Sequence, residues 1–151
     1  MKPLLSEKIK AYNIALGNFD GISSFNIYRD DEYTQHQQSS ILEINPDHPD
    51  YKIYDIVKKI EVPVLKFKTF VKEYNIDTSL YDVLSIDVQG YEYQVLQGAN
   101  EILPQIDYLY LEVNNDETYE GNKLVEDIDE LLSGFKRVET EWVGRTWGDA
   151  F

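Results

Sequence analysis

The second half of the chain alternates apolar segments with segments of helical periodicity, and this order restricts the possible folds most. Residues 83–88 and 108–113 are nearly continuous in apolar side chains, which is typical of strands covered on both faces. After each of them, apolar residues recur at the spacing of one helix face, over residues 95–103 and 124–132. An alternating segment, residues 135–143, indicates a further strand. This order predicts an α/β fold in which right-handed crossovers place both helices on the sheet.

The first half of the chain gives shorter signals. They predict two strands, over residues 9–16 and 22–28, and then a long polar loop over residues 29–50. An extended segment over residues 62–67 and a short helix over residues 67–75 follow. A loop of that length in a small domain is usually functional or mobile. The sequence contains no internal repeat and no linker, so we expect residues 1–151 to form a single domain.

The charge and the cysteine content restrict the partners and the chemistry. With 28 acidic and 14 basic side chains the net charge is −14, which argues against nucleic acid and anionic membranes as partners. There is no cysteine, which excludes disulfides, thiolate nucleophiles and cysteine-based metal sites. No signal peptide and no apolar run long enough to cross a bilayer is present. We therefore expect a cytoplasmic protein that binds neither nucleic acid nor membrane.

Acidic residues stand where the two apolar strands end. Ligands of open α/β sheets bind beyond the carboxyl ends of the strands, and Asp87 and Glu112 occupy those positions. Adjacent parallel strands would bring both carboxylates to one edge of the sheet. Glu92 adds a third carboxylate in the first turn of the following helix, on the face that also carries Val95 and Leu96.

Structural roles are an alternative for each of these residues. Asp87 is also suited to cap the next helix, Glu92 to stabilise a helix dipole, and Glu112 to end a solvated strand. His36 and His48 lie in a polar loop, where solvated histidines are common, and His48 beside Pro49 is the better candidate for proton transfer. Glycoside hydrolysis by paired carboxylates stays formally open, although no spacing selects it.

One continuous block of the sequence resembles a known signature. Residues 81–99, YDVLSIDVQGYEYQVLQGA, are similar to the signature of the FkbM family of S-adenosylmethionine-dependent methyltransferases. Further segments fit the other blocks of that family in the right order: residues 13–16, Gly21, Phe25 and residues 39–42 before it, and residues 111–113, 119–121, 134–135 and 147–150 after it. The resemblance covers nearly the whole chain.

The resemblance implies a Rossmann-like class I methyltransferase sheet, mostly parallel with an antiparallel end. It implies S-adenosylmethionine as methyl donor and a hydroxyl of a small molecule or sugar as acceptor. Carried over to this chain, it gives the catalytic candidates Asp87, Glu92 and Glu112, with Asp87 as the base, and the acceptor-binding candidates Gln89, Asn114 and His48. A divalent metal held by Asp87, Glu112 and Asn114 is a weaker hypothesis.

The sequence departs from the family pattern at its start. The family begins with a strand that leads into an Asp-x-Gly-Ala-Asn-like turn and a second strand that ends in an acidic residue, and these hold the cofactor. Neither is found here, so the resemblance assigns no cofactor-binding residues and predicts a domain lacking its first strands. It also predicts that the last strand only begins at Phe151. A sheet without its central strand has an open edge, so we expect a homo-oligomer or a complementing chain. The alternative is a reduced, non-catalytic acidic binding module.

Overall fold

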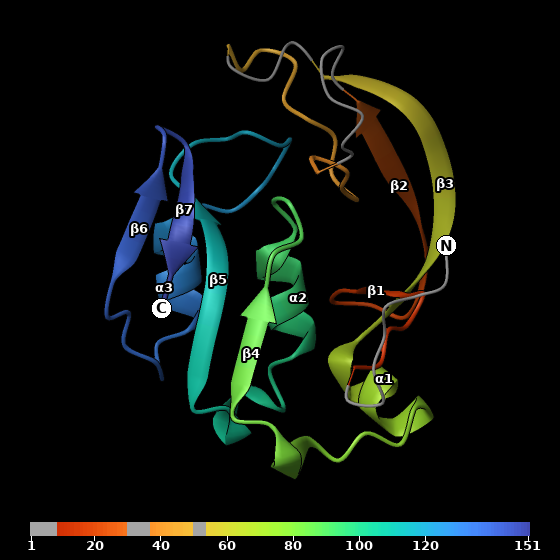
Figure 1. The fold of residues 1–151 in the computed structure, drawn as a ribbon, viewed down its shortest axis with the longest axis vertical. Helices are drawn as coiled ribbons and strands as arrows, with labels where there is room; N and C mark the ends of the chain where they lie inside the picture. Colours follow the sequence, from red (N-terminus) through yellow and green to blue (C-terminus); the bar gives the residue numbers. More distant parts are fainter. Residues whose placement is uncertain (1–8, 30–36, 50–53) are drawn as a thin grey trace.

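Two separate sheets, and not one, build the fold. The computed structural model describes residues 9–29, 37–49 and 54–151. Its strands are ordered β1-β3-β2 in a three-stranded sheet and β4-β5-β7-β6 in a four-stranded sheet (Figure 1). The strands are β1 (Ala15–Leu16), β2 (Gly21–Arg29), β3 (Asp55–Leu65), β4 (Val83–Ile86), β5 (Tyr108–Asn114), β6 (Thr140–Val143) and β7 (Trp147–Ala150). The mixed α/β class predicted from the sequence is thus confirmed.

The three-stranded sheet consists mainly of one long antiparallel pair. β2 and β3 run alongside each other from Gly21 opposite Val64 to Arg29 opposite Asp55. β1 adds only two residues in parallel with β3, so the strand predicted over residues 9–16 is much shorter than expected. β3 begins earlier than predicted. Its first half is exposed and contains lysines, so a pattern of apolar residues does not identify this part as a strand.

The four-stranded sheet contains the predicted parallel pair, β4 with β5, and an antiparallel end. β7 is antiparallel to both β5 and β6, so the expectation of a mostly parallel sheet is wrong. The reason is local: a tight turn with Gly144 at φ 70° returns the chain from β6 directly into β7. Of the strand predicted over residues 135–143, only the last four residues form a strand, β6. The last strand was expected only to begin at Phe151, and the structure has a last strand, β7, before that residue.

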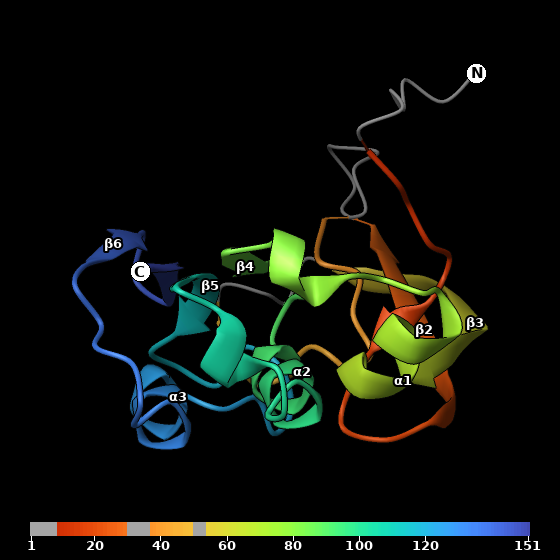
Figure 2. The ribbon, with the colours of Figure 1, turned by 90° about the horizontal axis from the view of Figure 1, so that it is seen from below.

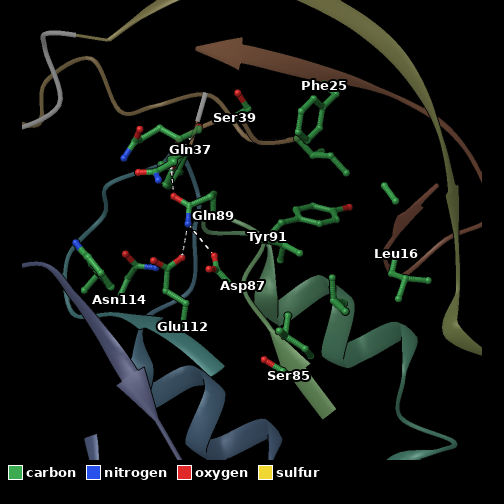
Figure 3. A pocket seen from close by; sticks show the side chains of 18 of the residues that line it. Leu16, Phe25, Gln37, Ser39, Ser85, Asp87, Gln89, Tyr91, Glu112 and Asn114 are labelled. Atoms are coloured by element: carbon green, nitrogen blue, oxygen red, sulfur yellow. Dashed lines mark hydrogen bonds between the residues drawn. The ribbon is translucent and has the colours of Figure 1, made fainter. Parts of the chain in front are cut away.

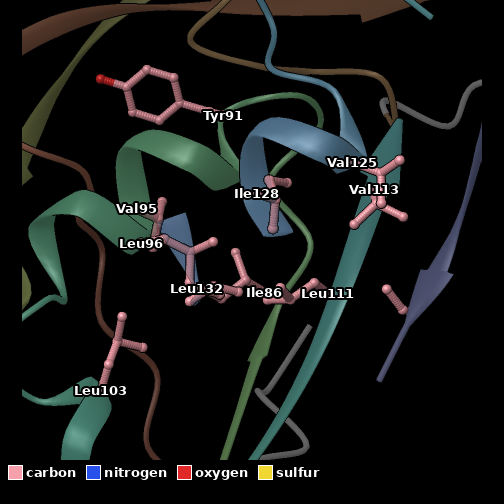
Figure 4. Packing of buried hydrophobic residues seen from close by; sticks show 11 residues of the cluster. Ile86, Tyr91, Val95, Leu96, Leu103, Leu111, Val113, Val125, Ile128 and Leu132 are labelled. Carbon is pink, nitrogen blue, oxygen red and sulfur yellow. The ribbon is translucent and has the colours of Figure 1, made fainter. Parts of the chain in front are cut away.

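Three α-helices occur among the described residues: α1 (Phe67–Glu73), α2 (Glu92–Gly98) and α3 (Val125–Leu131). α2 and α3 lie on the same side of the four-stranded sheet, as the view from below shows (Figure 2). The main apolar core fills the space between these helices and β4 and β5 (Figure 4). It includes the fully buried Leu96 and Val113.

The three-stranded sheet meets the helical layer where α2 ends, through the loop between β1 and β2. A Cβ atom on Gly98 would lie 1.8 Å from the carbonyl oxygen of Gly17, so only glycine allows this approach. Beside it, Nδ2 of Asn18 donates to Oε1 of Gln97 at 2.9 Å. This contact fixes the three-stranded sheet beside the helical layer and shapes the space between the sheets. None of the helices in the described part of the chain is long and apolar enough to cross a membrane.

Candidate active site

A sharp turn connects β4 to α2 and carries the block that resembles the family signature. Gln89 and Gly90 both have left-handed backbone, with φ 55° and 89°. The carboxylate of Glu92 holds this turn from inside, since its Oε1 accepts the backbone N–H of Val88 at 3.0 Å and of Gly90 at 3.1 Å. Glu92 is buried, and its contacts with the turn support the structural alternative for this residue.

The three predicted carboxylates lie together. One oxygen from each of Asp87, Glu92 and Glu112 lies within 4.8 Å of the others. Asp87 is exposed and the two glutamates are buried. Burial raises the pKa of Glu92 to about 7, although hydrogen bonds from its own backbone N–H and from those of Val88 and Gly90 oppose it. Burial, then the charges of Asp87 and Glu92, raise the pKa of Glu112 to about 8, which favours its protonated form at neutral pH.

The amide of Gln89 links two of these carboxyl groups (Figure 3). Its Nε2 lies 2.8 Å from Oδ1 of Asp87 and 2.8 Å from Oε2 of Glu112. Its Oε1 accepts a hydrogen bond from the hydroxyl of Tyr119 at 3.1 Å, which fixes the orientation of the amide. Its backbone oxygen accepts from Oγ of the buried Ser40 at 2.7 Å. Sequence reasoning placed Ser40 and Tyr119 in segments that fit the family blocks but gave neither residue a role in the site, because no local pattern relates them to the turn.

A cavity of about 910 Å³ opens over this network, between the two sheets. Its polar end is formed by Ser85, Asp87, Gln89, Glu112, Asn114 and Asp149. Its apolar end is formed by Leu16, Phe25, Ile41, Val88, Tyr91 and Val95, and Figure 3 shows Phe25, Tyr91 and Leu16 on the side away from Glu112 and Asn114. None of the described lining residues is Lys, Arg or His.

The structure brings together most of the predicted site residues but not all. Asp87, Gln89, Glu112 and Asn114 line the cavity, and Oδ1 of Asn114 accepts from the hydroxyl of Thr118 at 3.1 Å. His48 is not among the described lining residues. It is buried, with Nε2 3.4 Å from Oδ2 of Asp116. His36 falls outside the described residues.

Three acidic side chains, Asp87, Glu92 and Glu112, lie close enough together to share a cation. The Gln89 amide already donates to Oδ1 of Asp87 and to Oε2 of Glu112, and Glu92 accepts from two backbone N–H groups. Oδ1 of Asn114, the third predicted ligand, accepts from Thr118. A cation would compete with these donors, so we derive no step through a metal.

Comparison with protein families identifies the domain. A model described as the methyltransferase FkbM domain matches residues 3–139. The chain belongs to the FkbM methyltransferase family. The resemblance of residues 81–99 is therefore confirmed, and residues of the turn within this block line the cavity of this FkbM domain. Searches among curated proteins and solved structures found no match.

The family suggests S-adenosylmethionine as methyl donor, and the described residues of this FkbM domain fit that molecule only in charge. The carboxylates of the cavity suit a positively charged sulfonium. The Asp-x-Gly-Ala-Asn-like turn that holds the cofactor in the family pattern is not found among the described residues. The turn before α2 belongs to another block of the sequence and is closely packed, since a Cβ on Gly90 would lie 2.7 Å from Cδ2 of Tyr119.

Proposed function

We propose that this domain serves methyl transfer from S-adenosylmethionine to a hydroxyl of a small molecule or sugar, with Asp87 as the base. The observation that supports the proposal most is that three adjacent carboxyl groups, in a domain of the FkbM family, differ in burial and in hydrogen bonding. Glu112 carries its proton and Glu92 is held by backbone donors. Asp87 is the exposed group of the three, and it lines the cavity.

The reaction requires the acceptor hydroxyl to lose its proton as the new O–CH₃ bond forms. When bound, the cofactor would supply an electrophilic methyl group, whose bond to sulfur breaks as the O–CH₃ bond forms, so that S-adenosylhomocysteine is the leaving group. Asp87 would accept the proton of the acceptor hydroxyl, while the Gln89 amide holds the carboxylate in place. The protonated Glu112, 2.8 Å from the same amide, would donate to a second acceptor oxygen. Two such contacts fix an acceptor with neighbouring oxygens, and orientation contributes much of the rate.

The second candidate is a non-catalytic acidic binding module, or a half-domain completed by a partner chain. The observation that favours it is the sequence, in which the Asp-x-Gly-Ala-Asn-like cofactor turn of the family pattern is not found. Under this alternative the cavity still binds a polar small molecule through Asp87, Gln89 and Asn114, and no methyl is transferred by this chain alone.

Calorimetric titration of the chain with S-adenosylmethionine, followed by transfer of labelled methyl to a panel of glycosides and alcohols, tests the proposal. Asp87→Asn should keep the affinity for the donor and lose about 100-fold or more in turnover. The matched control is Asp82→Asn, which makes the same change just before the first residue of β4 and should leave turnover unchanged. A folded sample that gives no heat with millimolar donor would exclude autonomous catalysis and favour the binding module.

A further inference from the structure

One face of the four-stranded sheet carries no helix from the described residues. α2 and α3 both pack on the opposite face (Figure 2). β4 and β5 form a parallel pair, and parallel strands are normally covered on both faces, because their connections place helices there. The uncovered side of this pair is therefore a surface where a partner is expected to bind.

The side chains on this face are large and apolar. We call it the open face and define it by residues that alternate with core positions: Val83, Ser85, Tyr108, Tyr110 and Asp149, together with Phe151. The same alternation places Glu112 and Asn114 on this side at the carboxyl end of β5, where they line the cavity. Val83 is 57% exposed and lies opposite Tyr108, which is 68% exposed. The ring of Tyr110 stacks on Phe151, with 5.5 Å between centroids. Adjacent exposed side chains of this kind mark an interaction surface more often than a free one.

The open face is also acidic. Asp149 accepts a hydrogen bond from the hydroxyl of Tyr110, and the charges of Asp149, Glu141 and Asp87 further raise the pKa of Tyr110. Aromatic rings beside carboxylates attract Lys and Arg side chains through both the ring faces and the charges. The open face is thus suited to a partner that presents apolar side chains with positively charged side chains beside them.

We propose that the open face binds a basic amphipathic helix of a second polypeptide. Its apolar side would cover Val83, Tyr108 and Tyr110, and its Lys or Arg side chains would reach Asp149 and Glu141. The seven residues of β5 span about 23 Å, which corresponds to a helix of about 15 residues, and the end of that helix would reach Glu112 and Asn114 in the cavity. This inference goes beyond the proposed function, since it assigns a polypeptide partner, and the bound helix would compete with a small-molecule acceptor in the cavity.

Charge selects this occupant over a second copy of the chain. Each copy carries a net charge of −14, and two open faces would bring Asp149 and Glu141 of one copy against the same residues of the other. A basic helix removes this repulsion. The bound helix would also close the cavity on one side, because Ser85, Tyr110 and Asp149 of the open face line it.

The test titrates the ¹⁵N-labelled full chain with a synthetic helical peptide of about 15 residues, in which leucines form one face and lysines the other. We expect amide shifts to concentrate on β4, β5 and β7. A peptide with glutamate in place of lysine should bind at least about tenfold more weakly. Equal affinity for the two peptides, or shifts confined to α2, α3 or the three-stranded sheet, would overturn the proposal.

The double variant Val83→Ser/Tyr108→Ser removes apolar area without a change of charge. It should weaken binding of the lysine peptide by about tenfold or more. Ile22→Ser is the matched control, because Ile22 is an equally exposed apolar residue on the other sheet, and it should leave the affinity within about twofold. Light scattering completes the test: a dimer of the chain alone that the double variant dissociates would assign the open face to a second copy and overturn the proposal.

Discussion

Nε2 of Gln89 lies 2.8 Å from Oε2 of Glu112, so the turn after β4 holds the carboxyl group that β5 provides. The second hydrogen of the same amide is directed at Oδ1 of Asp87. The hydroxyl of Tyr119 determines which end of the amide faces the carboxyl groups, since it donates to Oε1. Residues from three separate parts of the chain therefore orient one pair of carboxyl groups.

Replacing Gln89 by leucine should raise the pKa of Glu112 above its value of about 8. The amide donates to the carboxylate and so lowers this pKa, while burial and the neighbouring charges raise it. Leucine keeps much of the volume and removes the donor. The titration of the Glu112 carboxyl carbon by NMR measures the effect. Gln105→Leu makes the same change at an exposed residue that does not line the cavity, so it is the control and should leave the titration unchanged. A Glu112 pKa that stays the same in Gln89→Leu would contradict the role of the amide.

The protein should lose stability as the pH rises from about 5.5 to 8.5. The pKa of Glu112 is raised from 4.5 to about 8 in the folded state, so the folded state binds more protons than the unfolded state between these values. The contribution of Glu112 to the stability of the folded state is complete below about pH 4.5 and is lost as the pH rises past about 8. Glu92, with a pKa raised to about 7, acts in the same direction.

Urea unfolding at both pH values measures this loss, and Glu112→Gln should reduce it by on the order of 1 kcal/mol. Glu73→Gln removes one negative charge from an exposed position of α1 and serves as the control for net charge. If both variants flatten the pH dependence equally, then the general charge of the protein, and not the buried carboxyl, is responsible.

The meeting of Asp87 and Glu112 was predictable from the sequence, because both end apolar strands that pair in parallel. The packing of Tyr119 on Gly90 was not predictable. This contact joins residues far apart in the chain, and no periodic pattern in the sequence indicates it. His48 shows the same limit: as a loop histidine it suggested proton transfer, and the fold buries it beside Asp116.

The sequence likewise predicted some elements of the fold and missed others. Local periodicity predicted β4, β5 and both helices that cover them, since each has a buried apolar stripe or run. Periodicity missed most of β3, whose stability comes from its long pairing with β2 and not from burial of its own side chains. It also missed the separation into two sheets, which depends on the order in which strands pair.

Leu96→Ala should destabilise the domain by about 3 kcal/mol. Leu96 is fully buried between α2 and the sheet, so its truncation loses apolar burial and leaves a cavity. Leu80→Ala makes the same change at a position that is 72% exposed and should stay within about 0.5 kcal/mol of the wild type. Urea unfolding of the three proteins checks this, and a similar loss for both variants would contradict the assignment of the core.

Gly98→Ala should destabilise the domain by about 2 kcal/mol or more, although alanine is the better helix former. The added Cβ would lie 1.8 Å from the carbonyl oxygen of Gly17, so α2 and the three-stranded sheet must separate. Gly134→Ala adds the same atom where nothing lies within 4 Å and should be neutral. Urea unfolding compares the two, and amide shifts around Asn18 report the separation. A neutral Gly98→Ala would mean that α2 and the loop between β1 and β2 do not approach each other at this point.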